Sequence, residues 1–214
     1  MPSSTTAVRH TQAERRREAE GALLDAAVRL FARKGIDHTS LADIGEEAGY
    51  SRGLANHHFG SKAVLVERLA ARAQSRFVAQ LLPSGGGDEI DALVGMARTY
   101  LDIVGRNPTS SRAFLVMWGA ALPGDAALRP VFVTDDARFR DGVAAIVRAG
   151  QSNATIDATI DTAGFAVAFV GLMRGTTAQL LIDPDGVDLT KVGDICERFV
   201  RSALSPRDSA GCAR

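Results

Sequence analysis

Residues 51–62 carry a dense set of hydrogen-bond donors of the kinds that read DNA. Arginine can donate two bonds to O6 and N7 of guanine, asparagine can bridge N6 and N7 of adenine, and serine and histidine can contact bases or phosphates. The predicted contacts of this kind are Ser51, Arg52, Asn56, His57 and His58. Gly53 removes a side chain where the backbone could approach DNA closely. Lys62 stands in the first turn of a further predicted helix, where a lysine beside free N–H groups would bind a phosphate.

Two short helices joined by a tight turn would position these side chains. Ser40 and Asp43 have the spacing of a capping box, so a helix should begin near Leu41, with Leu41, Ile44 and Ala48 on its apolar face. Gly49 would end it by adopting the left-handed conformation that the turn requires. A second cap at Ser51 and a break at Gly60 delimit the next helix, and Ser61 would cap a third. Residues 39–62 therefore predict a helix-turn-helix.

The neighbouring segments read as helices that brace this motif. The helix ending at Lys34 repeats Leu23, Ala27, Leu30 and Phe31 at helical spacing and stops at Gly35. Residues 1–14 are expected to form a mobile arm. Arg15, Arg16 and Arg17 then stand either in a solvated first turn or in an arm that reaches phosphates or a minor groove. A long helix from Ser61 to Leu82, with Val64, Leu65, Leu69 and Phe77 on its apolar face, would connect the two halves of the chain.

This stretch resembles the DNA-binding region of the tetracycline-repressor (TetR) family. The residues that carry the resemblance are Thr39-Ser40, Asp43-Ile44, Ala48-Gly49, Ser51-Arg52-Gly53 and His58-Phe59-Gly60-Ser61-Lys62, together with residues 23–35. It covers about residues 15–75 and implies that Thr39 and Ser40 also belong to the DNA-binding surface. Asn56 stands where many members carry tyrosine, so no base preference carries over. Residues 171–189 resemble a betaine-regulator-like branch of the family.

The same stretch contains a pattern that belongs to a different chemistry. Gly49-Tyr50-Ser51-Arg52-Gly53 matches G-x-S-x-G, the nucleophile elbow of serine hydrolases, and two histidines follow it. That elbow needs a buried strand before the serine, whereas the residues before Ser51 are polar and helical. Adjacent histidines point in different directions on a helix, so His57 and His58 make a poor metal pair. We expect no metal, no cofactor and no enzymatic activity.

Composition places the chain among soluble globular proteins. Of its 214 residues, 46% are hydrophobic and 23% charged. The net charge is zero but uneven, because residues 1–80 hold 12 Lys/Arg and 9 Asp/Glu, and residues 81–214 hold 13 and 16. Cys196 and Cys212 read as reduced thiols. The longest charge-free apolar run, residues 162–173, is too short to span a bilayer, and the N-terminus has no signal peptide, so the expected location is the cytoplasm.

The rest of the chain predicts an all-α fold of about nine helices. Pro83 and the run Ser84-Gly85-Gly86-Gly87 form the clearest break, and no alternating strand pattern follows it. The expected domains are a DNA-binding domain over 15–62, an effector-binding and dimerisation domain over 63–204, and a flexible tail over 205–214. The later helices are expected at 88–106, 109–122, 125–150, 157–182 and 188–204.

The last two of these helices are expected to form a homodimer interface. Residues 161–181 are apolar and rich in small residues, as in a helix covered on nearly all sides, and an amphipathic helix follows. The family resemblance implies the same four-helix interface. Two-fold symmetry would place two recognition helices about one DNA turn or slightly more apart, on an inverted-repeat operator.

Large apolar residues in the later helices could be core or could line a pocket for a small-molecule effector. The candidates for the pocket are Phe114, Met117, Trp118, Phe132, Phe169 and Met173, with Arg138 and Arg174 for an anionic group on the effector. The alternative for the two arginines is an ion pair with Asp135, Asp161 or Asp102.

Together these expectations favour a transcriptional regulator, with the resemblance implying a repressor that an effector releases from DNA. Two other classes remain open: an all-helical interaction protein whose helix-turn-helix has lost DNA binding, and, with less support, a hydrolase using Ser51.

Overall fold

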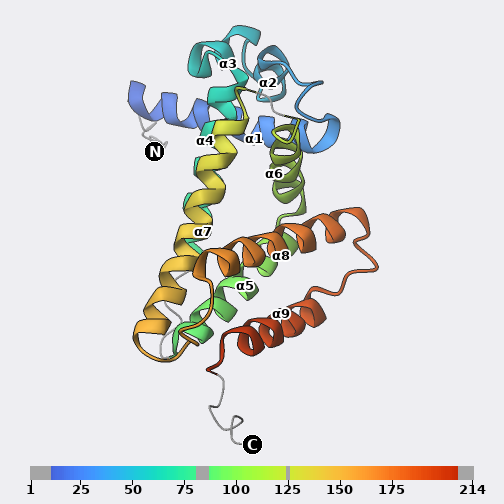
Figure 1. The fold of residues 1–214 in the computed structure, drawn as a ribbon. Coiled ribbons are helices and arrows are strands. Elements are labelled where there is room, and N and C mark those ends of the chain that lie inside the picture. Colours follow the sequence, from blue (N-terminus) through green and yellow to red (C-terminus); the bar gives the residue numbers. More distant parts are fainter. Residues whose placement is uncertain (1–10, 81–86, 124–125, 207–214) are drawn as a thin grey trace, which may run out of the picture.

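The computed structural model describes residues 11–80, 87–123 and 126–206, which form nine α-helices and no strand (Figure 1). This confirms the predicted all-α class. The helices are α1 (Gln12–Lys34), α2 (Leu41–Glu47), α3 (Arg52–Phe59), α4 (Lys62–Gln80), α5 (Glu89–Arg106), α6 (Pro108–Ala120), α7 (Arg129–Ser152), α8 (Thr162–Ile182) and α9 (Leu189–Leu204). The predicted breaks at residues 83–86 and the end of the tail lie outside the described residues.

A first hydrophobic core lies under the helix-turn-helix, at the top of Figure 1. Leu23, Phe31, Ile44 and Leu65 are completely buried in it, as expected from the periodic apolar residues of α1, α2 and α4. Helix α6 lies along α1 and adds Met117 to the same core. Packing is therefore continuous across residue 62, between the segment that would bind DNA and the helices that follow it.

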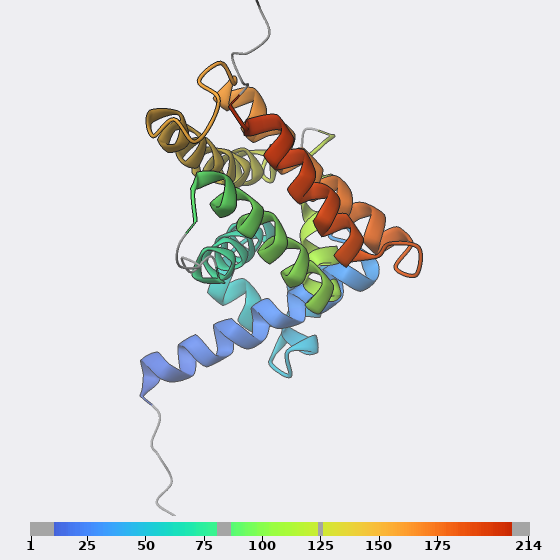
Figure 2. The ribbon, with the colours of Figure 1, turned by 90° about the horizontal axis from the view of Figure 1, so that it is seen from below.

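A second core holds the lower part of the molecule together. It is formed by α5, α7, α8 and α9, with Leu93, Val143, Met173 and Leu204 completely buried. Helix α5 packs against α7, α8 and α9, while α8 packs on α7. Seen from below, α8 and α9 lie on the same side of the molecule (Figure 2).

The start of α1 corrects the predicted arm. The helix begins at Gln12, because Thr11 and Glu14 form a reciprocal capping box that satisfies free backbone N–H groups. Arg15, Arg16 and Arg17 are exposed and belong to the body of this helix, whose first turns project beyond the rest of the molecule (Figure 2). They are thus presented by a rigid helix, and residues 1–10 lie outside the described part.

Two later helices begin after the predicted residues. Helix α7 starts at Arg129 instead of residue 125, and α8 starts at Thr162 instead of residue 157. Before α8 the backbone forms a turn in which Asp157 accepts bonds from Thr159, and the Gln151 amide donates to the Ile160 carbonyl. Asp161 then caps the helix by accepting from the Ala163 N–H. These side-chain bonds give the backbone partners outside a helix, a competition that periodicity does not reveal.

Helix α8 is less enclosed than its composition predicted. Its small-residue face, including Val167, Ala168, Gly171 and Gly175, is exposed in the single chain. By length and composition α8 is also the one helix of the described chain that could cross a membrane. The core helix of a soluble protein meets the same criteria, and the opposite face of α8 packs in the second core.

Candidate nucleic-acid interface and ligand cavity

Local hydrogen bonds fix the start of α2. The Ser40 hydroxyl accepts from the Asp43 N–H at 3.1 Å and the Asp43 carboxylate accepts from the Ser40 N–H at 2.9 Å, which confirms the predicted capping box. These bonds, with the Lys34 ammonium 3.0 Å from the same carboxylate, lower the pKa of Asp43 to about 2. Asp43 therefore stays ionised across the physiological range.

The turn between α2 and α3 depends on two glycines. Gly49 has φ +78°, the left-handed conformation predicted for it. Gly45 is needed for a different reason, because a Cβ there would lie 2.5 Å from the Ser51 carbonyl oxygen. The two helices thus approach so closely that only glycine fits at this position, a requirement that the sequence motif did not reveal.

Helix α3 presents the predicted DNA-reading side chains at the end of the molecule. Arg52, Asn56 and His57 are exposed and His58 is half-buried, while Ala55 and Phe59 turn into the first core. Leu54, predicted on the packing side, is half-buried. Gly53 is exposed, with no atom within 4 Å of the position its Cβ would take. The open side of α3 is therefore free to approach a groove of DNA.

Arg52 is already engaged by a carboxylate. Its guanidinium forms a short ion pair with Glu46 of α2, and this contact raises the pKa of Arg52. Both side chains are at least half exposed. Glu46 accepts from Nε, so the Nη donors of Arg52 remain available for a base contact.

Three other predicted contacts also have roles within the fold. Thr39 is buried and its hydroxyl donates to the Gly35 carbonyl at 2.7 Å, which leaves it in a supporting position behind the surface. Ser40 is exposed but acts as the cap of α2. The Lys62 ammonium donates to the Ile36 carbonyl at 3.0 Å and is half-buried. Ser51 stands at the N-cap position of α3 without the predicted side-chain bond.

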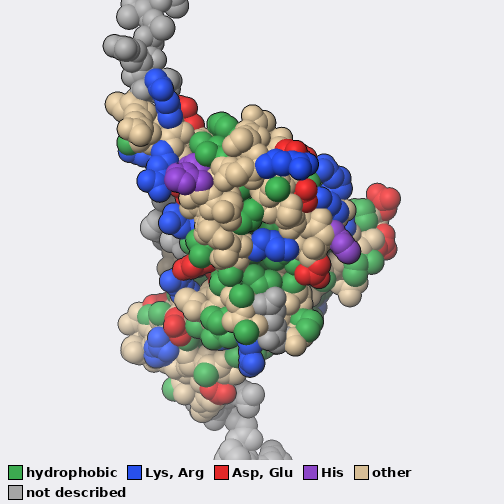
Figure 3. Space-filling model, turned by 90° about the horizontal axis from the view of Figure 1, so that it is seen from above, with side chains coloured by type: hydrophobic (Ala, Val, Ile, Leu, Met, Phe, Trp, Pro, Cys, Tyr) green, Lys and Arg blue, Asp and Glu red, His purple; other side chains and the backbone are tan. Residues whose placement is uncertain are grey.

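Ion pairs join α1 to α2 behind this surface. Glu47 accepts from Arg29 at 3.0 Å and from Arg33 at 3.1 Å. The cations at the end of α1 thus hold α2 against the brace helix. Seen from above, basic, acidic and histidine side chains are interspersed over this end of the molecule (Figure 3).

The surroundings of Ser51 differ from a nucleophile elbow. Ser51 follows the turn after α2 and precedes α3, so a helix stands where the elbow needs a strand. Its hydroxyl is exposed at the start of α3. The G-x-S-x-G pattern here belongs to a helix-turn-helix.

A cavity of about 250 Å³ lies between the two cores. Its apolar lining is Val28, Leu69, Ala73, Tyr100, Ile103, Val104, Ala113, Phe114, Met117 and Phe139, from α1, α4, α5, α6 and α7. Its polar lining is Arg72, Arg76, Asn107, Ser110, Ser111, Arg174 and Thr177. An apolar enclosure with a few convergent polar groups is the usual form of a small-molecule site.

Three of the eight predicted pocket residues line this cavity: Phe114, Met117 and Arg174. Phe132 is buried in the first core, and Phe169 and Met173 in the second. Arg138 is exposed, which corrects its predicted apolar neighbourhood. These residues are of the same types as those that line the cavity, but their side chains point elsewhere from their helices.

Trp118 and Arg174 belong to one polar cluster at the edge of the cavity. The Trp118 indole donates to Asp136 at 2.9 Å, and the Arg174 guanidinium lies 2.9 Å from Asp136 and 3.6 Å from Asp135. Arg174 therefore forms the ion pair that was predicted as its alternative role. Asp135 was among the predicted partners, and Asp136, which was not, lies nearer. Burial raises the pKa of Asp135, and Arg174 opposes that rise.

Three cavity residues that bear chemistry were not predicted from the sequence: Arg72 and Arg76 of α4 and Tyr100 of α5. The spacing of Arg72 and Arg76, four residues apart and so on one helix face, was the available signal. Arg68 shares that spacing yet pairs with Glu20 away from the cavity. Only the packing of α4 separates these arginines.

Two protein-family models match the chain. Residues 23–69 match the model described as "Bacterial regulatory proteins, tetR family". Residues 89–205 match "BetI-type transcriptional repressor, C-terminal". The chain is also 28% identical over 213 residues to the HTH-type transcriptional regulator TtgR of Pseudomonas putida, an alignment covering 92% of this chain and 94% of that protein.

Solved structures share the fold. A putative TetR-family regulator from Rhodococcus sp. superposes with a TM-score of 0.77 at 22% identity, covering 88% of this chain and all of that one. A putative transcriptional regulator from Saccharomonospora viridis, solved in complex with choline, gives a TM-score of 0.74 at 24% identity, covering 89% of this chain and all of that one.

Proposed function

We propose, because this chain belongs to the TetR family of bacterial transcriptional regulators, that it represses transcription as a homodimer on an inverted-repeat operator and is released by a small-molecule effector. Regulation of transcription through DNA binding comes with the family. The operator, the dimer interface, the effector site and a location in the cytoplasm are our proposals for this chain.

The observation that carries the DNA-binding proposal is the open side of α3. Arg52, Asn56 and His57 are exposed there on a helix whose opposite side is anchored in the first core. Such a helix fits the major groove of B-DNA, and these donors match guanine and adenine edges. Lys62 and the exposed arginines of α1 lie on neighbouring helices and supply candidate phosphate contacts.

The exposed faces of α8 and α9 support the proposed dimer. Phe199 is 58% exposed and Val167 57%, and Ile195 is 41% exposed, although each is a large apolar side chain. Gly171 and Gly175 lie on the exposed side of α8 and have no atom within 4 Å of the position of a Cβ. A second copy of the same two helices could approach closely across these glycines and bury the apolar side chains.

The cavity is the proposed effector site because of what it touches. Its lining includes Leu69 and Arg72 of α4, the helix that begins directly after α3, and Val28 of α1. A ligand that prefers one arrangement of these helices would shift the population toward it, and with it the spacing of the two recognition helices. Helix α4 is therefore the proposed lever.

Selection of bound sequences from a random duplex library tests the DNA-binding proposal. We expect an inverted repeat, bound with an affinity that falls as salt rises. Lys62→Ala should weaken all sequences alike and reduce the salt slope by about one, whereas Arg52→Ala and Asn56→Ala should also relax base preference. Arg148→Ala, an exposed arginine of α7, is the matched control and should change neither.

The outcome separates this function from the alternative. A folded protein that enriches no sequence, with equal and negligible effects of the three substitutions, would identify an interaction protein that uses the helix-turn-helix for protein contacts. Ester hydrolysis abolished by Ser51→Ala would instead favour the hydrolase.

Sedimentation analysis of Phe199→Glu tests the dimer. A charge at this position should shift the equilibrium toward monomer, because the carboxylate would be buried without a partner. Leu122→Glu is the control, since Leu122 is a large apolar residue that is 69% exposed in the turn after α6 and belongs to neither α8 nor α9. Equal behaviour of both variants as dimers would contradict the proposed interface.

A further inference from the structure

We infer that the effector is a small organic anion, an apolar body bearing a carboxylate or a similar group, held by arginines of α4 and α8. This rests on the proposed function and names the chemical class that the cavity takes. The inference comes from the charge, the partners and the size of the lining.

Every charged residue among the described residues that line the cavity is an arginine. Arg72 and Arg76 lie one turn apart on α4, and Arg174 comes from α8. Arginine keeps its charge and offers a planar set of donors that matches a carboxylate. Asn107 and Ser110 add neutral polar groups to the same lining. The described charged side chains that line the cavity are thus all cationic, with Arg72 paired to Asp25 and Arg174 to Asp135 and Asp136 behind the lining.

Arg174 retains one hydrogen-bond donor that the described structure does not use. Its side chain is 11% exposed and already pairs with Asp136, yet its Nε is buried and has no hydrogen-bond partner in the described structure. A buried donor without an acceptor is costly. An anionic ligand in the cavity would bring acceptor oxygens close to this guanidinium.

The same residue argues against a cationic ligand. Quaternary ammonium ions are bound over aromatic faces or beside acids. The guanidinium carbon of Arg174 lies 4.2 Å from the centroid of the Phe114 ring, so the protein's own cation already occupies that face. The choline of the Saccharomonospora viridis structure is such a cation, and we therefore expect this chain to reject choline.

The cavity volume limits the apolar body. A volume of about 250 Å³ is below the roughly 300 to 1,000 Å³ of drug-sized pockets. An apolar cavity of about 150 Å³ holds benzene. A single ring or a short alkyl chain with one acidic group fits between these sizes.

Binding of an anion would act directly on the contact between α4 and α1. Arg72 lines the cavity and also pairs with Asp25 of α1, at 2.7 Å. A ligand carboxylate would compete with Asp25 for the same guanidinium. Loss of that pair would loosen α4 from the brace helix, which gives the ligand a route to the spacing of the DNA-binding ends.

Calorimetry with matched ligands tests the inference on the full-length protein. The probes are phenylacetate, phenylacetamide and the phenethylammonium ion, with hexanoate, hexanamide and the hexylammonium ion as a second body shape. We expect the carboxylates to bind at least about tenfold more tightly than the amides, as for hydrogen bonds to charged groups, and the ammonium ions and choline to bind more weakly still.

Substitutions then assign the charge to particular residues. Arg72→Gln and Arg76→Gln should each weaken carboxylate binding by about tenfold while leaving the amides unchanged. Arg68→Gln is the matched control on the same helix, because Arg68 pairs with Glu20 and does not line the cavity. Asp25→Asn should tighten carboxylate binding by roughly two- to fivefold, since it removes the competing anion.

Several results would overturn the inference while leaving the proposed function intact. These are equal binding of carboxylates and amides, preference for an ammonium ion, binding of no carboxylate at millimolar concentration, or equal effects of the Arg68 and Arg72 substitutions. Conversely, carboxylate binding with the expected pattern in a protein that selects no operator would refute the proposed function alone.

Discussion

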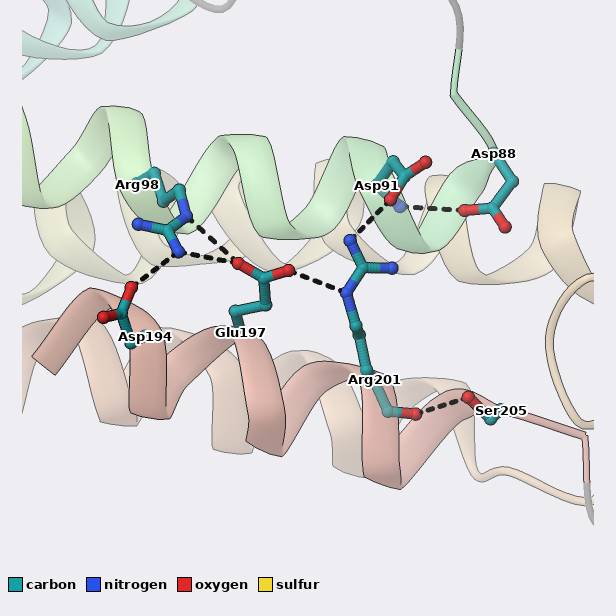
Figure 4. Close-up of polar contacts among 7 residues, drawn as sticks. All are labelled: Asp88, Asp91, Arg98, Asp194, Glu197, Arg201 and Ser205. Carbon is teal, nitrogen blue, oxygen red and sulfur yellow. Dashed lines mark hydrogen bonds and ion pairs between the residues drawn. The ribbon is translucent and has the colours of Figure 1, made fainter. Parts of the chain in front are cut away.

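The helix-turn-helix and the cavity differ in how far apart along the chain their functional residues lie. The first is contained in residues 39–62, and its cap joins residues only three apart. The cavity collects residues from Val28 to Thr177. The lower helices around it are tied by ion pairs such as Arg98–Glu197 and Asp91–Arg201, which join α5 to α9 (Figure 4).

This difference teaches where each site gets its geometry. The helix-turn-helix is shaped by caps and close backbone approach within one segment, so single local changes should damage it. The cavity is shaped by the packing of six helices, so exposed ion pairs should matter little and buried groups should matter most.

Arg174→Gln should lower the free energy of unfolding by about 3 to 5 kcal/mol, because it leaves Asp136 and Asp135 buried without their cation. Burial raises the pKa of Asp135 in the folded protein above its ordinary value. The stability that this carboxyl contributes is therefore present below the ordinary pKa and is lost as the pH rises through the raised one. The loss in the variant should therefore be larger at about pH 7 than at about pH 5. Urea unfolding at both pH values measures this.

Adding Asp136→Asn to Arg174→Gln should recover part of the loss. A small, pH-independent effect of Arg174→Gln would show that the cavity edge tolerates unpaired carboxylates. That result would contradict the expectation that buried groups matter most around the cavity.

Gly45→Ala should cost about 1 to 3 kcal/mol, because the new Cβ would lie against the Ser51 carbonyl and force α2 away from α3. DNA affinity should fall with it. Gly53→Ala is the matched comparison, since this glycine has open space and alanine favours a helix by up to about 1 kcal/mol. If α3 approaches DNA closely, this variant should be folded and stable but bind the operator weakly. Thermal unfolding measures the stability of each variant, and operator titration measures its DNA affinity. Equal stability of the Gly45 and Gly53 variants would contradict the prediction.

Glu197→Gln should lower stability only slightly, although Glu197 accepts from both Arg98 and Arg201. These side chains are 28 to 45% exposed, so water screens the pairs. A double-mutant cycle with Asp91→Asn measures the coupling between Glu197 and Asp91, which both pair with Arg201. A loss as large as that expected for Arg174→Gln would mean that the second core depends on this network and not only on buried packing.

Acid should loosen the start of α2 before it affects the rest of that helix. The folded pKa of Asp43 is about 2, below its ordinary value near 3.8, so its contribution is present above about pH 4 and is lost as pH falls toward 2. Titration of Asp43 by NMR, with amide exchange at Ser40, follows this. Asp43→Asn should remove the pH dependence at Ser40, and an unshifted titration would contradict the cap.

The sequence was most informative where structure is local. The Ser40–Asp43 capping box, the left-handed Gly49 and the ends of α1 and α5 follow from residue types within a few positions. It was least informative for the cavity, because the rotation of each helix about its axis decides which of its residues line the cavity. Arg68 and Arg72 are both arginines and lie one turn apart on α4, yet Arg72 lines the cavity whereas Arg68 pairs with Glu20. Val64 was likewise predicted to be buried and is exposed, while Val66 is buried.

The ion pair between Arg52 and Glu46 has a consequence for how the protein searches a genome. An arginine held by a neighbouring carboxylate contributes little to attraction by the phosphates of arbitrary DNA. If Arg52 contacts DNA as proposed, residence on wrong sequences would be correspondingly shorter. A base that offers two acceptors can still be read by the Nη donors of Arg52, because the ion pair uses Nε. Under the proposed function, the pair would therefore lower nonspecific attraction to DNA without preventing base recognition by Arg52.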